Sequence, residues 1–404
     1  MTTMCRVTLS AAIWALFGTL PSAIAALPAH GHRATPTTSI ALGPLAVCHT
    51  WPYTQVADGA FAAFTGRNRV VVESRLMGPE YMVVGGNSPL AGLPGPIAFK
   101  HPGGGLSHFG PSAAISGDGS LMAAEVHRAG AWWRVWVWHV AGAGRRAPIA
   151  MDGLPAYPQL HAMSFSPKGR LIAFMGTSHQ SKRERLILCR TSNGKLEQTL
   201  RFPKYVKHPK DYIVAMISFV SRHQIDCVIG RSGRVHLLGW NLPSGKLCLA
   251  GVGIKSPGGV WCGASDRESN EFLLSGTALH AKAPGLLILD SGNGATVSRI
   301  KMGRLGGGKM GKRFESGVTA TGIAVAPDGR FAVVVGFGRL AKRRRGSRLG
   351  GWLKVIDVKA GKVIYSANSL PAEVPWHVAV SPGGRRLVVA SNTRFYILRA
   401  PFRL

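Results

Sequence analysis

The sequence predicts an all-β protein: a single seven-bladed β-propeller of four-stranded blades, whose ring is closed by an N-terminal strand. Three observations predict this fold. A strand–turn–strand unit recurs seven times, a third strand with a small-residue turn follows most copies, and the chain ends directly after such a third strand. Repeats of about 40 to 50 residues, none of which can bury its apolar faces alone, are typical of propellers.

The recurring hairpin is clearest in residues 163–177, 323–337 and 378–392, where two short apolar strands flank a turn that contains Pro and Gly. Residues 55–67 and 114–127 keep an Asp-Gly turn, whereas 217–231 and 262–277 keep only the strand pattern. Pro presets φ and Gly accepts a left-handed conformation, so both favour tight turns. The predicted turns recur about every 50 residues, at Asp58, Asp118, Lys168, His223, Arg267, Asp328 and Gly383.

A third apolar strand follows most of these hairpins, at residues 135–141, 185–191, 235–241, 285–291, 352–359 and 394–400. Small-residue turns come next, at 192–195, 244–246, 292–294 and 360–362, and a fourth strand such as 362–368 completes the unit. The last unit has no room for its fourth strand, and residues 38–48 can supply it. We expect this pairing to close the ring, because it would protect an otherwise open sheet edge.

The last complete unit carries a recognisable pattern. Residues 355–364 read VIDVKAGKVI and residues 378–385 read VAVSPGGR. This segment resembles the repeat of WD40/YVTN-like propellers, and the likeness extends in weaker form over nearly the whole chain. The Trp-Asp dipeptide of strict WD40 repeats is replaced by Trp138-His139, Leu289-Asp290 and Ile356-Asp357. The resemblance therefore implies the superfamily and its fold but no individual family.

The first 25 residues have the features of a signal peptide. Arg6 precedes an apolar stretch over residues 7–20, and Ala23-Ile24-Ala25 match a small-x-small cleavage site. We expect a flexible mature N-terminus at 26–37, a propeller over 38–404, and export to the periplasm, cell envelope or exterior. An uncleaved N-terminal anchor is the alternative, and we expect no transmembrane segment after the signal.

The cysteines do not form a disulfide pattern. Cys5 lies in the predicted signal, which leaves an odd number spread through strand-like segments: Cys48, Cys189, Cys227, Cys248 and Cys262. We expect most of them to be single buried thiols, although one bridge stays open.

The charge is strongly unbalanced, with 49 Lys and Arg against 18 Asp and Glu and a formal net charge of +31. Such a surplus favours a polyanionic partner: an acidic protein, or an anionic polymer such as a polysaccharide, an envelope lipid or nucleic acid. A proteome rich in Arg would produce the same surplus without any specific partner, so both explanations stay open. We expect a monomer.

The basic residues gather in two classes of connection. Loops between the second and third strands of a blade lie on the same face as connections between blades, and we expect this loop-rich face to bind the anionic partner. The predicted binding residues are Lys182, Arg183, Arg185, Lys204, Lys207, Lys210, Lys309, Lys312, Arg313, Lys342, Arg343, Arg344 and Arg345. The opposite face is also basic, through Lys168, Arg170, Arg330, Arg385 and Arg386.

Recognisable catalytic motifs are scarce, and we expect no cofactor and no metal site. Residues 303–310 nearly match a phosphate-binding loop, but Met310 replaces the required Ser or Thr. Four tryptophans at 132, 133, 136 and 138 are expected to fill space between blades, with ligand stacking as the alternative. The leading hypothesis is therefore a non-enzymatic binding scaffold. A propeller enzyme, lactonase-like or another hydrolase, and an assembly protein with an apolar rim are the alternatives.

Overall fold

The chain divides into two compact units, residues 1–35 and 36–404, and every residue that the computed structural model describes lies in the second. The predicted signal peptide at 1–25 and the N-terminal segment at 26–37 thus lie outside the described residues. The described residues are 41–42, 45–52, 60–66, 69–74, 78–83, 97–98, 107–128, 133–140, 147–151, 159–177, 185–204, 206, 212–231, 233–256, 259–266, 269–277, 285–302, 314–340, 349–370, 374–391 and 394–400.

Strands and turns make up all of these described segments, with no helix among them, which confirms the all-β prediction. No helix long and apolar enough to cross a bilayer is found in this part of the chain. Middle strands such as 185–190 have runs of four consecutive buried side chains. They are covered on both faces, and burying each Val, Leu or Ile contributes about 1.5–3 kcal/mol.

Four antiparallel sheets have four strands each, and every strand pairs with the next one along the chain. The first has β3 (Ala60–Gly66), β4 (Arg69–Ser74), β5 (Gly78–Val83) and β6 (Ile97–Ala98). The second has β7 (Ser107–Ile115), β8 (Leu121–Arg128), β9 (Trp133–His139) and β10 (Ile149–Ala150). The third has β11 (Gln159–Phe165), β12 (Leu171–Thr177), β13 (Arg185–Arg190) and β14 (Leu196–Arg201). The fourth has β15 (Ile213–Phe219), β16 (Gln224–Arg231), β17 (Arg234–Asn241) and β18 (Leu247–Lys255).

An eight-stranded sheet contains the next two runs of four strands. They are β19 (Gly259–Asp266), β20 (Glu271–Thr277), β21 (Gly285–Asp290) and β22 (Thr296–Lys301), followed by β23 (Phe314–Val325), β24 (Phe331–Leu340), β25 (Leu349–Asp357) and β26 (Lys362–Leu370). One residue pair, Thr277 with Thr319, joins β20 to β23 and so merges the two runs. The described strands therefore form six sheets where the sequence predicts seven separate ones.

The last sheet combines both ends of the second unit. Its strands are β27 (Pro375–Val380), β28 (Arg386–Ser391), β29 (Arg394–Arg399), β2 (Leu45–Pro52) and β1 (Ala41–Leu42). N-terminal β2 pairs antiparallel with C-terminal β29, from Ala46 opposite Arg399 to Pro52 opposite Arg394.

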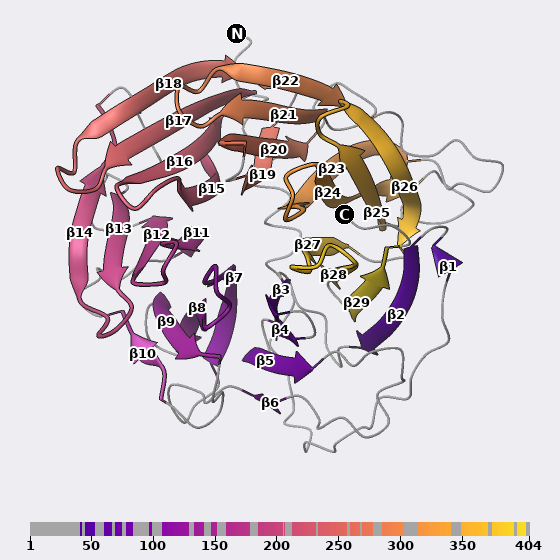
Figure 1. The fold of residues 1–404 in the computed structure, drawn as a ribbon, viewed down its shortest axis with the longest axis horizontal. Coiled ribbons are helices and arrows are strands. Elements are labelled where there is room, and N and C mark those ends of the chain that lie inside the picture. Colours follow the sequence, from indigo (N-terminus) through magenta and orange to yellow (C-terminus); the bar gives the residue numbers. More distant parts are fainter. Residues whose placement is uncertain are drawn as a thin grey trace, which may run out of the picture. The chain divides into compact units, whose positions relative to one another are not determined.

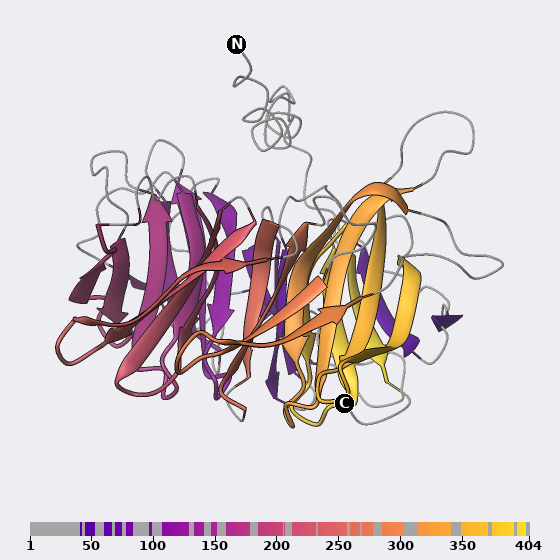
Figure 2. The same ribbon diagram turned by 90° about the horizontal axis from the view of Figure 1, so that it is seen from above.

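The core lies between neighbouring runs of strands. Seven hydrophobic clusters are found among the described residues, each with members from two consecutive runs. One joins Phe174 of β12 to Val135 of β9, and another joins Ala62 of β3 to Val388 of β28. The first strands of the runs (β3, β7, β11, β15, β19, β23 and β27) each contact the next, and β27 contacts β3. Figure 1 shows these strands innermost in the second unit, and Figure 2 shows the sheets from the side. The described fold is thus a β-propeller with four-stranded blades.

Turns of two classes lie at one end of the sheets, which we call the turn face: those from first to second strand and those from third to fourth. A backbone hydrogen bond joins the two turns within a run, for example from the Val358 N–H to the Arg330 carbonyl at 2.8 Å. Equivalent bonds run from Val140 to Ser120, Thr191 to Arg170, Leu242 to His223, Ser291 to Asn270 and Ala400 to Arg385. Gly119, Gly169, Gly329 and Gly384 adopt positive φ in the first class of turn, as the Gly-containing pattern predicts. The opposite end is the loop face, where second strands pass to third strands.

The first blade differs from the predicted repeat. The sequence places a turn at Asp58, between two strands of residues 55–67. In the structure residues 60–66 form the innermost strand β3, which pairs with β4 across residues 67–68. The prediction that residues 60–66 form the second strand of a hairpin is therefore wrong, because they form the first strand of their sheet. Asp58 and Gly59 precede this strand in the sequence, and residues 53–59 lie outside the described set.

The single-cysteine prediction is confirmed for three of the described thiols. Cys189, Cys227 and Cys262 are buried, whereas Cys248 is exposed. Burial raises the pKa of the Cys262 thiol to about 12, so this group is an inert packing residue. Trp138 is also buried, in the cluster between β3–β6 and β7–β10, as the packing interpretation predicts.

Candidate binding surfaces

The predicted loop-face residues are described only in part. Arg185 is half-buried at the start of β13, and Lys204 is exposed just after β14. The other predicted binding residues lie outside the described residues: Lys182, Arg183, Lys207, Lys210, Lys309, Lys312, Arg313, Lys342, Arg343, Arg344 and Arg345.

The described part of the loop face nevertheless carries a set of cations at the strand ends. We call them the loop-end cations: Arg134, Arg185, Arg201, Lys204, Arg234, Lys255, Lys301 and Arg339. Arg185 lies directly opposite Arg201 across β13 and β14, and Arg234 lies opposite Lys255 across β17 and β18. Like charges directly opposite each other destabilise a sheet, so an anion at this end would relieve both pairs.

The acidic side chains are distributed differently. Those whose side chains are described and not deeply buried all lie at the turn face: Asp118, Glu197, Glu271, Asp290 and Asp328. Several of them cap turns, as where the Asp290 carboxylate accepts hydrogen bonds from the Gly292 and Asn293 N–H groups. The Ser116 hydroxyl and the Ser120 N–H hold the pKa of Asp118 below its usual value. Within the described residues, exposed acids thus occur at the turn face and not among the loop-end cations.

The turn face has cations of its own at the predicted positions. Lys168, Arg170, Arg330 and Arg385 are exposed and Arg386 is half-buried. The positive charge of this face is partly compensated. The Arg190 guanidinium pairs with Glu197, and two nitrogens of Arg330 lie 3.3 Å from Oδ2 of Asp357.

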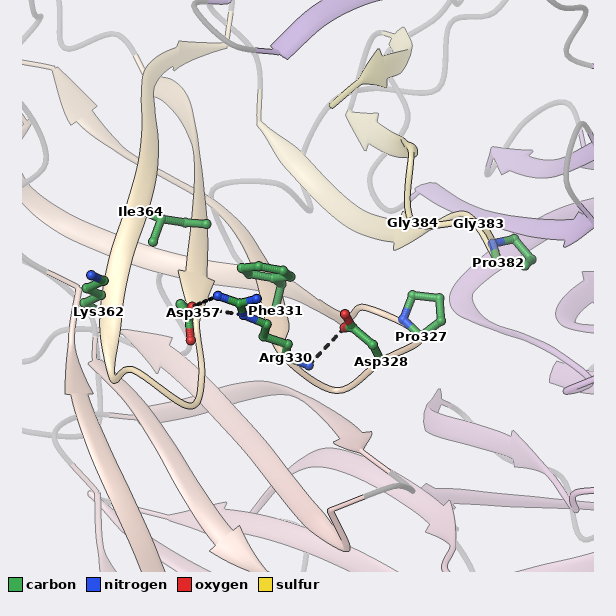
Figure 3. A pocket seen from close by; sticks show the side chains of 10 residues that line it. All are labelled: Pro327, Asp328, Arg330, Phe331, Asp357, Lys362, Ile364, Pro382, Gly383 and Gly384. Atoms are coloured by element: carbon green, nitrogen blue, oxygen red, sulfur yellow. Dashed lines mark hydrogen bonds and ion pairs between the residues drawn. The ribbon is translucent and has the colours of Figure 1, made fainter. Parts of the chain in front are cut away.

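A groove of about 720 Å³ opens at the turn face, between the β23–β26 run and the turn that joins β27 to β28. Figure 3 shows Arg330 and Asp357 on one wall, with Phe331 beside the guanidinium and Pro382 across from them. Sequence reasoning assigned Arg330 to this face but did not identify the groove, because its lining comes from four separate segments. The sequence signal for the groove was Ile364, an apolar residue on a fourth strand, where the structure leaves it exposed.

Ionisable groups are also buried between blades, but in different interfaces. Asp226 lies in β16 on the side of the β19–β22 run, where burial raises its carboxyl pKa to about 7. Lys354 lies in β25, its ammonium donates to the Met302 carbonyl, and burial lowers its pKa to about 8. No three His, Cys, Asp or Glu side chains in the described segments are grouped as metal ligands would be.

Comparison with known proteins identifies the fold. No known sequence family matches the chain, and no curated protein does either. Among solved structures, the C-terminal WD40 domain of Sif2 is similar, with a TM-score of 0.55, 10% identity and coverage of 89% of this chain and 99% of that domain. Hydrazine synthase from Kuenenia stuttgartiensis is similar too, with a TM-score of 0.59, 11% identity and coverage of 86% of this chain and 96% of that one. At such identities the likeness concerns fold alone. The chain therefore has the fold of WD40-like β-propellers.

Proposed function

We propose that this protein is an exported, non-enzymatic binding scaffold: a seven-bladed propeller whose basic loop face engages an anionic partner. The partner class is an acidic protein or an anionic polymer. The observation that carries the proposal is that the described loop face exposes the loop-end cations and no acid, whereas exposed acids accompany the cations of the turn face.

The blade number rests on packing. The eight-stranded sheet consists of two runs of four strands that share one residue pair, and each run has its own hydrophobic clusters with its neighbours. Counting each run as a blade gives seven, in agreement with the seven clusters among the described residues. The pairing of β2 with β29 supports ring closure by the N-terminal strand.

Anion binding is supported by the cost of leaving the loop face empty. Arg185 with Arg201, and Arg234 with Lys255, are two like-charged pairs in consecutive sheets. Exposed charges at this density create a positive potential, which attracts polyanions from a distance and weakens as salt increases. The formal net charge of +31 has the same consequence for the whole chain.

Retention on a heparin column across a salt gradient tests this proposal. We expect the variant with Lys342, Arg343, Arg344 and Arg345 replaced by Ser to elute at clearly lower salt than the wild type. A matched control removes the same charge from the turn face, with Lys168, Arg170, Lys195 and Lys246 replaced by Ser. If both variants shift equally, the charge acts through composition alone and the proposal fails.

Export has a separate test. Expression with the native leader should release a protein whose N-terminal residue is Ala26, as read by N-terminal sequencing. Recovery of the uncleaved chain from the membrane fraction would support an N-terminal anchor instead.

A further inference from the structure

The groove on the turn face combines charge with an apolar floor. Arg330 and Lys362 supply the cations, while Phe331, Ile364, Pro327 and Pro382 supply apolar surface. Ile364 is 39% exposed and is one of three large hydrophobic side chains exposed among the described residues. An exposed isoleucine in a concave site beside exposed cations is typical of a surface that a partner covers.

Asp357 holds Arg330 in one orientation. Nε and Nη2 of Arg330 both donate to Oδ2 of Asp357 at 3.3 Å, and the guanidinium carbon lies 4.9 Å from the Phe331 ring centre. The other oxygen of Asp357 accepts a 2.8 Å hydrogen bond from the Ala360 N–H. That bond and the Arg330 guanidinium hold the pKa of Asp357 below its usual value, so the carboxylate stays ionised and keeps the arginine in place.

The oriented guanidinium keeps donors available for a ligand. Guanidinium has five N–H donors, and Asp357 uses only its Nε and Nη2 side. The Arg330 side chain is 61% exposed, whereas Asp357 is only 8% exposed. Asp328 is also engaged, because its carboxylate accepts a 3.0 Å hydrogen bond from the backbone N–H of Arg330. The two carboxylates of the lining offset the formal charge of its two cations, but both make hydrogen bonds within the protein, whereas the Arg330 side chain keeps donors toward solvent.

We propose that this groove binds an acidic peptide segment of a partner protein. A carboxylate of the peptide would bind Arg330 and Lys362, and a neighbouring apolar side chain would cover Ile364 beside Phe331. A phosphodiester or sulfated polysaccharide offers charge but no aliphatic side chain for this floor, so the groove chemistry favours a peptide. The site goes beyond the proposed loop-face function, because it lies at the other end of the sheets and does not use the loop-face cations.

Fluorescence anisotropy with two labelled peptides tests the proposal. One alternates Glu with Leu, and the other has the same length and the same number of Glu residues with Ser in place of Leu. We expect the Glu-Leu peptide to bind at least fivefold more tightly than the Glu-Ser peptide. Arg330→Gln should weaken Glu-Leu binding at least tenfold, and Ile364→Ser should remove most of the preference for Leu. Equal affinity for the two peptides would overturn the proposal.

Arg190→Gln is the matched control, because Arg190 is another exposed arginine of the turn face that pairs with a carboxylate, that of Glu197. It removes the same charge from a different blade and should leave binding unchanged; equal weakening by Arg190→Gln and Arg330→Gln would refute a specific groove.

Asp357→Asn separates orientation from net charge. The amide oxygen still accepts from Ala360, but the net charge rises by one and Arg330 loses its anchor. We expect weaker peptide binding, and stronger binding would show that charge alone decides. The quadruple loop-face variant should bind the peptide as the wild type does, so failure of the groove and failure of the loop face are distinguishable.

Discussion

Replacing Asp226 by Asn should stabilise the propeller at neutral pH and remove part of its pH dependence. Asp226 is 1% exposed in β16, and its Oδ1 accepts a 3.0 Å hydrogen bond from the Gln224 amide. The other oxygen, Oδ2, has no hydrogen-bond partner among the described residues. Burial disfavours the ionised form, which is why the pKa rises from 3.8 to about 7.

The sign follows from linkage. A carboxyl whose pKa is raised by folding contributes most to stability at low pH, where the folded state keeps it neutral, and this contribution is lost as pH rises toward 7. Each pKa unit corresponds to about 1.4 kcal/mol, so the shift of about three units amounts to about 4 kcal/mol in total. Of this, about 2 to 3 kcal/mol should be lost between pH 5 and pH 8.

Urea unfolding of both proteins at pH 5, 6, 7 and 8 measures this contribution. Asn has nearly the shape of Asp, and its oxygen still accepts from Gln224, so packing is preserved. The stability advantage of Asp226→Asn over the wild type should increase by about 2 to 3 kcal/mol from pH 5 to pH 8. A constant difference across this range would refute the assignment of a neutral, buried Asp226.

Three further predictions concern buried groups and close packing. Lys354→Met should raise Tm at pH 7 and raise it less at pH 10, because folding lowers the lysine pKa from 10.5 to about 8 and the wild type therefore loses stability as pH falls from 10.5 toward 8; an equal gain at both pH values would contradict this. His377→Phe should reduce the loss of Tm between pH 6 and pH 4, since burial lowers the His377 pKa to about 4 and its ring packs 4.6 Å from Phe61; unchanged acid sensitivity would count against it. Gly239→Ala should destabilise by about 1 to 3 kcal/mol, because the new methyl would lie 2.6 Å from Oδ1 of Asp226 and 2.9 Å from Cβ of Leu249. Gly383→Ala, where nothing lies within 4 Å, is the matched control and should be nearly neutral.

The all-β propeller architecture could be predicted from local chemistry. The Pro-Lys-Gly turn at 167–169 and the Pro-Asp-Gly turn at 327–329 each impose a tight hairpin, and both glycines have the positive φ that this requires. The first blade was misassigned because Asp58-Gly59 has the same composition as those turns. Composition alone does not distinguish a turn within a hairpin from a connection that precedes an inner strand.

The groove and the buried charges could not be predicted from the sequence, for a geometric reason. Middle strands are covered on both faces, so Asp226 stands between buried Ile225 and Cys227 with no period-two pattern to reveal its environment. The wall of the groove brings Arg330 next to Asp357, 27 positions later, and the turn at 382–384 lies beside both. Which residues meet there depends on how two blades pack together.

The hydrogen bonds between turns at the turn face have a consequence for the evolution of this chain. Because amide and carbonyl groups join each pair of turns, this contact does not depend on the side chains, and Asp118, Lys168, Asp328 and Gly383 occupy corresponding positions in different blades. Repeats joined in this way can diverge until their sequences resemble neither one another nor those of distant relatives. A chain that matches no sequence family can therefore share its architecture with structures only 10 to 11% identical to it, and its surface is left open to acquire new partners.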